Sequence, residues 1–210
     1  LAQPDFDALQ SAGTYLNVHT PLNPGGEIRG QVVPTGYLVY FGQLNGEQEA
    51  PTPRITAARG TVAVTVTTAT GATDARVNAT GIDDATAAHL HQAFGGSNGP
   101  VVVGLERDTA NPGLWRSNGA TLTATQVTGL RDGGFYANVH TAAAPAGLIR
   151  GQILPPNVQM VVTHLNGSQA VPAVTTPDTA RATTTVNLGT SRLTTHVNIT
   201  GLGNATEAHI

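Results

Sequence analysis

The sequence of 210 residues is written almost twice, at a spacing of about 120 residues. Residues 1–34 return as residues 122–155, so that the motifs NVHT and IRGQ each occur twice, 121 residues apart. LNGEQEAP, which begins at Leu44, matches LNGSQAVP at the same offset, and ATGIDDATAAHL matches the terminal ITGLGNATEAHI at an offset of 120. A period of this length is a whole domain and not a short solenoid repeat.

The repeat predicts a tandem array of domains. Residues 1–34 are the C-terminal part of one unit, residues 35–156 are a complete unit, and residues 157–210 are the N-terminal part of a further unit. A unit of about 120 residues has the ordinary size of a domain. The joints are short and contain proline, so we expect consecutive units to be packed together, and we expect the array to continue beyond the printed sequence.

The composition indicates a polar surface with few charges. Charged residues make up 11% of the chain, against ~25% in an average soluble protein, and all ten basic residues are arginines. Polarity comes instead from hydroxyl and amide side chains, which suits a protein outside the cell. A net charge of −3 without a basic cluster argues against nucleic acid and anionic membranes as partners.

Two further classes are excluded by composition. No apolar run approaches the ~20 residues that span a bilayer, so no membrane span is expected. Cysteine is absent, so neither disulfides nor cysteine-based metal sites can form. Motifs of nucleotide-binding proteins and of serine hydrolases are also missing from the sequence.

Apolar residues alternate with polar ones along most of the unit. GTVAVTVTT at residues 60–68 is typical of a half-buried strand, and residues 73–80 and 193–200 follow the same pattern. Clusters of Gly and Pro separate such segments. Only residues 5–11 and their repeat, 126–132, suggest a turn of helix. About seven or eight short strands per unit predict an all-β fold, a Greek-key β-sandwich of the immunoglobulin-like kind.

Three histidines of the complete unit carry the strongest chemical signal. His89 and His91 lie in AAHLHQ, and His140 lies in YANVHT. On a strand the side chains alternate, so Leu90 and Val139 point into the core while the histidines point to the other face. If the two strands are neighbours, three imidazoles converge. Imidazole suits copper, zinc, nickel or iron, and three ligands leave an open coordination position.

The repeat serves as a control for this interpretation, since an isolated H-x-H also occurs by chance on solvated strands. His19 repeats His140 in an identical NVHT context, and His209 repeats His89. His164 and His196 have no histidine counterpart. The recurrence favours a metal site in each unit, with His19 and His209 belonging to the sites of the two partial units.

Other polar residues have candidate roles beside the histidines. Asn138 shares their face and is a candidate for supporting the metal ligands. Arg150 repeats as Arg29, and we favour a structural role in which the guanidinium binds carbonyl oxygens or a carboxylate, the alternative being the guidance of an anion toward a metal. Four N-x-S/T sequons are candidate glycosylation sites: Asn78, Asn166, Asn198 and Asn204.

Three blocks of the sequence, in order, resemble one known family. LNGEQEAP, TAAHLHQAFGGSNGPVVVGL and YANVHT followed by LIRGQI are similar to the CHRD domain, named after chordin and common in exported bacterial proteins. The resemblance covers one complete copy and parts of two others. It implies an extracellular, cell-surface or periplasmic β-sandwich.

A weaker resemblance is to copper/zinc superoxide dismutase, another Greek-key β-sandwich. That family has H-x-H on one strand, V-H on a late strand, and an Arg close to the end. The resemblance implies that His89, His91 and His140 are copper ligands and that Arg150 lies near the open face. No histidine between His91 and His140 could supply the family's bridging and zinc ligands, and the cysteine pair is missing. A three-histidine copper site survives the comparison.

The sequence thus predicts an exported tandem-repeat protein with a structural or surface-assembly role and a three-histidine site per unit. Copper is the first candidate for the metal, and zinc the second. The expected partners are the protein itself or neighbouring units, joined head to tail in a filament. Two alternatives stay open: a copper metalloenzyme of superoxide-dismutase type, and a periplasmic copper-binding or storage protein.

Overall fold

Alternation of buried and exposed residues defines the strands of the computed structural model, which describes residues 2–210. In β4 (Arg59–Thr67) the side chains of Val62, Val64 and Val66 are buried, while the residues between them are exposed or half-buried. The next strand, β5 (Ala72–Thr80), alternates along its whole length. The period of two that the sequence shows is therefore the period with which one face of the sheet meets the core.

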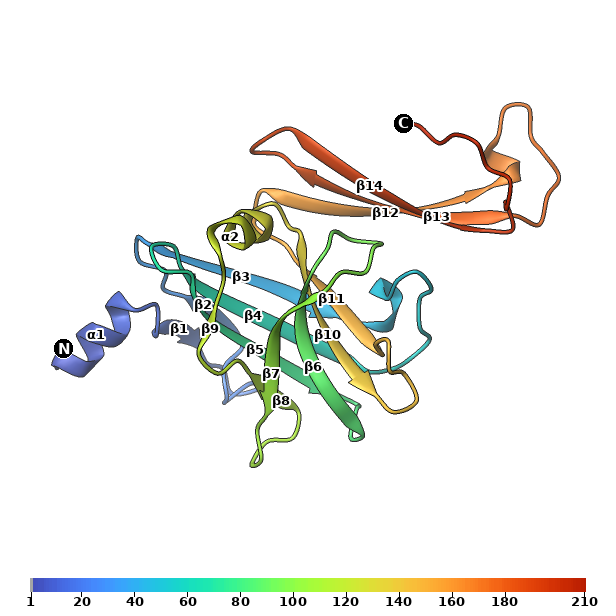
Figure 1. Ribbon diagram of the computed structural model, residues 1–210. Helices are drawn as coiled ribbons and strands as arrows, with labels where there is room; N and C mark the ends of the chain where they lie inside the picture. The colour runs from blue at the N-terminus through green and yellow to red at the C-terminus, as the bar shows by residue number, and fades with distance from the viewer. Residues whose placement is uncertain (1) are drawn as a thin grey trace.

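The elements follow one another in the order drawn in Figure 1. They are α1 (Gln3–Gln10), β1 (Tyr15–Val18), β2 (Ile28–Gln31), β3 (Tyr37–Leu44), the 3-10 turn η1 (Gly46–Gln48), β4, β5, β6 (Ala85–Gln92), β7 (Val101–Arg107), β8 (Leu114–Arg116), β9 (Ala120–Thr121), α2 (Ala124–Arg131), β10 (Phe135–Thr141), β11 (Ile149–Ile153), β12 (Val158–Asn166), η2 (Gly167–Gln169), β13 (Thr179–Asn187) and β14 (Arg192–Thr200). The expectation of an all-β fold is confirmed.

Nine strands between β3 and β11 form one curled sheet. Its order is β11-β10-β6-β7-β8-β5-β4-β3, and β9 pairs with β5. β10 follows β8 along the chain but returns to lie beside β6 in the sheet. The two edges meet through bridges from Asn45 to Arg150 and from Phe41 to Leu154. The unit is therefore a nearly closed barrel, where we expected two separate sheets packed face to face.

Apolar side chains from all around the sheet fill the barrel. Leu90 and Val139 are fully buried, as the alternation predicts, and they meet valines of β4 and β5 in one cluster. The core is a single cluster because the sheet is nearly closed, so residues on the inner face of every strand point to the same axis.

The two helices are longer than the sequence suggested. Each has eight residues, where a single turn was expected. In α2 the Thr123 hydroxyl accepts from the Gln126 backbone while the Gln126 side chain accepts from the Thr123 backbone, a capping box that starts the helix. Val127 and Leu130 then dock α2 on the barrel. Neither helix of the described chain is long and apolar enough to cross a membrane.

The end segments adopt the same local structure as the parts of the complete unit that they resemble. The hairpin β1–β2 pairs Tyr15 with Gln31, as β10–β11 pairs Tyr136 with Gln152. The sheet β12-β13-β14 has the register of β3-β4-β5. In Figure 1 this three-stranded sheet lies against one end of the barrel. The division into units stays a prediction. A tandem repeat requires matching registers in the repeated segments, and these segments have them.

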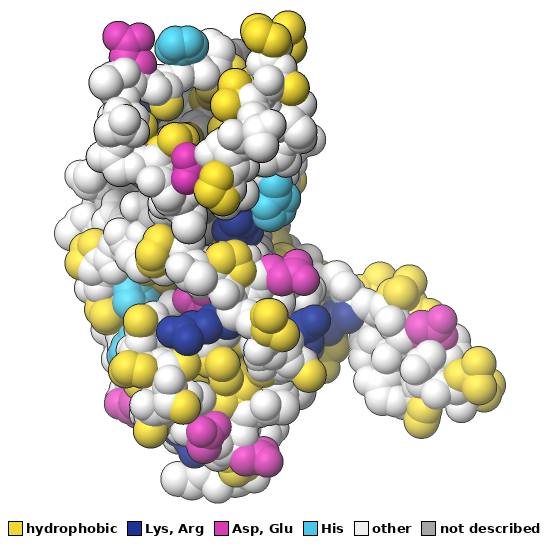
Figure 2. All heavy atoms as spheres, turned by 90° about the vertical axis from the view of Figure 1, so that its right-hand side faces the viewer, with side chains coloured by type: hydrophobic (Ala, Val, Ile, Leu, Met, Phe, Trp, Pro, Cys, Tyr) yellow, Lys and Arg dark blue, Asp and Glu magenta, His cyan; other side chains and the backbone are white. Residues whose placement is uncertain are grey.

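Uncharged polar groups dominate the face drawn in Figure 2, where charged side chains are scattered among white hydroxyl, amide and backbone atoms. This agrees with the low content of charged residues.

Core packing gives a first prediction. Leu90→Ala should lower the free energy of unfolding by about 2–5 kcal/mol, because it removes a fully buried side chain and leaves a cavity between two histidine-bearing positions. Ile55→Ala, at a fully exposed position, is the matched control and should change it by less than about 0.5 kcal/mol. Urea unfolding measures both. Equal, small effects would contradict the packing described here.

Candidate metal centre

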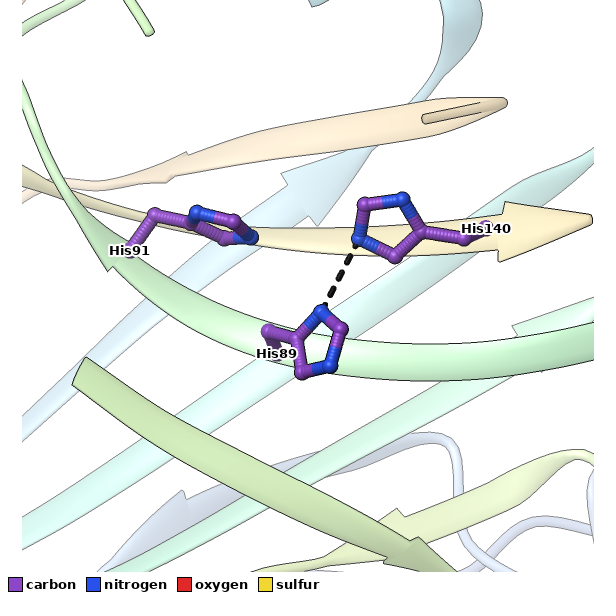
Figure 3. Close-up of side chains that lie close together, drawn as sticks. All are labelled: His89, His91 and His140. Atoms are coloured by element: carbon purple, nitrogen blue, oxygen red, sulfur yellow. Dashed lines mark hydrogen bonds between the residues drawn. The ribbon is translucent and has the colours of Figure 1, made fainter. Parts of the chain in front are cut away.

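The three predicted histidines meet on two neighbouring strands. His89 and His91 come from β6 and His140 from β10, and these strands are antiparallel partners in which Asn138 lies opposite His89. One ring nitrogen from each histidine lies within 4.8 Å of the others. Figure 3 shows the three rings turned toward one another. The alternation of the strands therefore places all three on one face, as expected.

Loops cover this face, which the sequence did not indicate. His91 and His140 are buried, and only His89 is half-buried. His89 lies opposite Gly104, where no side chain can cover it. His89 is therefore the most exposed of the three rings.

Backbone carbonyls orient two of the rings. The Nδ1 of His91 lies 3.0 Å from the carbonyl oxygen of Gly99, and the Nδ1 of His140 lies 3.1 Å from that of Pro145. A carbonyl can only accept, so in the neutral rings the proton is on Nδ1 and the Nε2 lone pair is free. The Nε2 of His91 is buried and has no hydrogen-bond partner among residues 2–210. Such an atom is suited to a metal ligand.

The third ring, that of His89, points its Nδ1 toward the cluster, whereas His91 and His140 point their Nε2 toward it. The Nδ1 of His89 lies 3.1 Å from the Nε2 of His140 (Figure 3). A metal at the centre would take His89 through Nδ1 and the other two through Nε2. His89 would then carry its proton on Nε2, the nitrogen that the other two rings use as ligand.

Burial keeps the three rings neutral at pH 7. It lowers the pKa of His89 and His140, and it lowers the pKa of His91 to about 4, with a smaller contribution from the neighbouring histidines and Arg150. Metal ligands must be deprotonated, so a lowered pKa reduces the competition between a metal and protons.

Arg150 acts as a clamp on the loop that covers the cluster. Its buried guanidinium donates to the carbonyl oxygens of Ser97 (2.8 Å) and Phe94 (3.1 Å), and also to the side chains of Asn98 and Gln152. The structural role that we favoured from the sequence accounts for these contacts. Burial lowers the pKa of Arg150 to about 10, which leaves it charged at neutral pH.

A stack of side chains links this clamp to the histidines. The guanidinium carbon of Arg150 lies 3.6 Å from the ring centroid of Tyr136, and that ring is parallel to His91 at 4.8 Å. The Tyr136 hydroxyl also accepts from the backbone N–H of Gly99, whose carbonyl orients His91. The position of His91 therefore depends on both Tyr136 and the clamped loop.

Asn138 is buried beside the cluster but does not hydrogen-bond to any of the three rings. It lies against Gly147, and so does Glu49, because a Cβ added at Gly147 would meet both side chains. Burial raises the pKa of Glu49 to about 7, and the charge of Arg150 and the Asn138 amide partly oppose this.

Sequence reasoning missed Glu49. The repeat has Ala170 at this position, so the acid is not needed for the turn. The two motifs also differ at Glu47 and Ala50, so the sequence alone did not single out Glu49.

The remaining predicted residues lie apart from the cluster. His19 and His209 are exposed and join no other histidine among the described residues, although the Nδ1 of His19 lies 2.9 Å from the carbonyl oxygen of Pro24, as that of His140 does from Pro145. Of the four sequons, Asn78, Asn166 and Asn204 are exposed. Asn198 is half-buried and donates to the carbonyl oxygen of Gly96, so it is the least suited to glycosylation.

Glu49 gives a second prediction. The folded chain holds the Glu49 proton more tightly than the unfolded chain, whose carboxyl titrates near 4.5. This contribution to stability is fully present below pH 4.5 and is lost as the pH rises through 7. We compare the free energy of unfolding of Glu49→Gln with that of the parent chain at each pH. The variant minus parent difference should be about 1–3 kcal/mol more positive at pH 8 than at pH 4.

Urea unfolding at the two pH values measures this difference, and the histidines cancel because both chains share them. Glu47→Gln, two residues away and exposed, is the matched control and should show no such change. A pH-independent difference for Glu49→Gln would mean that the carboxyl has the same pKa in the folded and the unfolded chain.

Comparison with known proteins identifies the family. The family model described as the CHRD domain matches residues 1–32 and 40–153. No curated protein and no solved structure matches the chain. The matched stretches include both NVHT motifs, the H-x-H strand and both arginines of IRGQ. The chain therefore belongs to the CHRD-domain family.

Proposed function

We propose that residues 35–156 form a metal-binding CHRD unit in which His89, His91 and His140 hold one transition-metal ion. The observation that carries this proposal is the convergence of three imidazole nitrogens within 4.8 Å, with the Nε2 of His91 buried and unpartnered among the described residues. A buried polar atom without a partner costs roughly 1–3 kcal/mol, and a metal ligand bond would remove that cost.

Copper is the metal that fits best. The cluster offers three neutral nitrogen donors and neither a thiolate nor a carboxylate, which favours copper or zinc over calcium, magnesium or manganese. Among divalent ions, Cu²⁺ binds such nitrogen sites more tightly than Zn²⁺ does. Three ligands leave one coordination position open, and His89 is the most exposed of the three rings.

A binding or structural role has more support than catalysis. The guanidinium of Arg150 donates its hydrogen bonds to the covering loop and to Gln152, so it is not available to bind an incoming anion. CHRD domains occur in secreted proteins, and the uncharged polar surface suits an extracellular, cell-surface or periplasmic location. We therefore propose an exported structural or surface-assembly protein whose units pack against one another, with the metal stabilising each unit.

The alternative is a copper enzyme acting on superoxide or another small oxidant. The open position beside three imidazoles favours it, since a small molecule could bind there. Activity toward superoxide in the copper-loaded chain, lost in His140→Ala, would support the enzyme. If the bound metal raises the melting temperature but the copper-loaded chain shows no activity, the enzyme alternative is wrong.

Metal titration is the third prediction. The metal-free chain should bind one Cu²⁺ per 210-residue chain at pH 7.5, measured by calorimetry and by copper electron paramagnetic resonance with nitrogen hyperfine splitting. His91→Ala and His140→Ala should each abolish this binding. His164→Ala, at an exposed histidine outside the cluster, is the matched control and should leave it unchanged.

The bound metal should also raise the free energy of unfolding, by about 2.7 kcal/mol at a free concentration 100 times the Kd. This gain should disappear in His140→Ala. Stoichiometric binding that survives both cluster substitutions would place the metal elsewhere and end the proposal.

A further inference from the structure

The barrel and the three-stranded C-terminal sheet meet at a joint built around a glycine loop, Phe94–Asn98. The Nδ2 of Asn198 donates to the carbonyl oxygen of Gly96 at 2.9 Å. A Cβ on Gly96 would come within 2.9 Å of the Cβ of Thr183, and one on Gly95 within 2.6 Å of the Sδ of Met160. Only a loop without side chains at these two positions fits against this sheet.

From the other side, the same loop is held by the barrel. Arg150 donates to two of its carbonyl oxygens, and Gln152 donates to the carbonyl oxygen of Ala93, just before the loop. The space left at this joint is only about 10 Å³. The glycine loop therefore fills the joint between Arg150 below and the C-terminal sheet above.

A second joint is lined by residues that correspond, in the repeat, to those of the first joint, but no loop lies between them. It lies between the β1–β2 hairpin and the outer face of β3-β4-β5, and it contains a groove of about 530 Å³. Its lining includes Val39, Ala63, Asn78 and Arg29. At the repeat offsets of 120 or 121 residues, these positions correspond in order to Met160, Thr183, Asn198 and Arg150 of the filled joint.

The groove presents its donors in the arrangement that holds the loop at the filled joint. Arg29 stacks on Tyr15 at 3.4 Å, as Arg150 stacks on Tyr136 at 3.6 Å. Among the described residues, the Arg29 side chain hydrogen-bonds only to Gln31, at 3.4 Å, and the side chain of Asn78 has no hydrogen bond. Both groups can therefore donate to backbone carbonyls, which is what Arg150 and Asn198 do.

We infer that this groove is a docking site for a second copy of the glycine loop, supplied by a complete CHRD unit on its N-terminal side. The inference names the surface through which units would pack, so it rests on the assembly role proposed above, although not on the metal. The matching walls select this occupant, since a loop of sequence FGGSN already fills the equivalent space at the other joint.

A lengthened chain tests the inference. A second copy of residues 35–121 is placed directly before Leu1, so that Thr121 is followed by Leu1 as it is otherwise followed by Leu122. Asn78→Ala should then lower the melting temperature by about 2–4 °C, because it removes a hydrogen bond to the docked loop. In the 210-residue chain the same substitution should change it by less than about 1 °C, since the amide has no partner there.

Three matched variants calibrate this result. Asn198→Ala should lower the melting temperature of the 210-residue chain, as its amide already holds Gly96. Asp84→Ala, at an exposed position outside both joints, should have no effect in either chain. Gly96→Val in the added copy should prevent docking of that copy and abolish the sensitivity to Asn78→Ala.

Equal effects of Asn78→Ala in the two chains would overturn the inference, and so would an added segment that stays unfolded. Copper titration of the lengthened chain separates this outcome from that of the metal proposal. If the lengthened chain docks the loop but binds no copper, the docking inference stands and the metal proposal is wrong. If it binds copper but does not dock the loop, the metal proposal stands and the docking inference is wrong.

Discussion

The buried guanidinium of Arg150 is the group on which the rest of the unit depends. Its backbone pairs with Asn45 to close the barrel, and its side chain donates to Phe94 and Ser97 in the loop over the histidines. Burying a charge costs several kcal/mol, which four acceptors and the face of Tyr136 offset here. One residue thus links the closure of the sheet, the covering loop and the C-terminal sheet that packs on that loop.

Burial also gives the histidine cluster its chemical character. A cluster open to water would exchange protons near pH 6.5, but these rings lie under loops that lower their pKa values. The carbonyl oxygens of Gly99 and Pro145 then decide which nitrogen of His91 and His140 keeps its proton. Neutral rings are the state in which imidazole can bind a metal, so this packing supports the metal-binding role proposed above.

Much of this arrangement could be predicted, and the failures have physical causes. Alternation placed Leu90 inside and both neighbouring histidines outside, since a strand has a side-chain period of two. Two separate sheets were expected instead of a nearly closed barrel, because closure depends on the twist and pairing of distant strands. Glu49 was missed because only its environment, beside Asn138 and Gly147, distinguishes it from an ordinary surface acid.

The sequence by itself determined the all-β class, the period of the repeat and the residues that share a face, since these follow from local patterns along one chain. Only the tertiary structure decided that β6 and β10 are neighbours, that loops bury His91 and His140 and that Arg150 holds one of those loops. The physical reason is that these relations join residues some 50 positions apart, whose contact depends on the strand order. No pattern within a single strand contains that order.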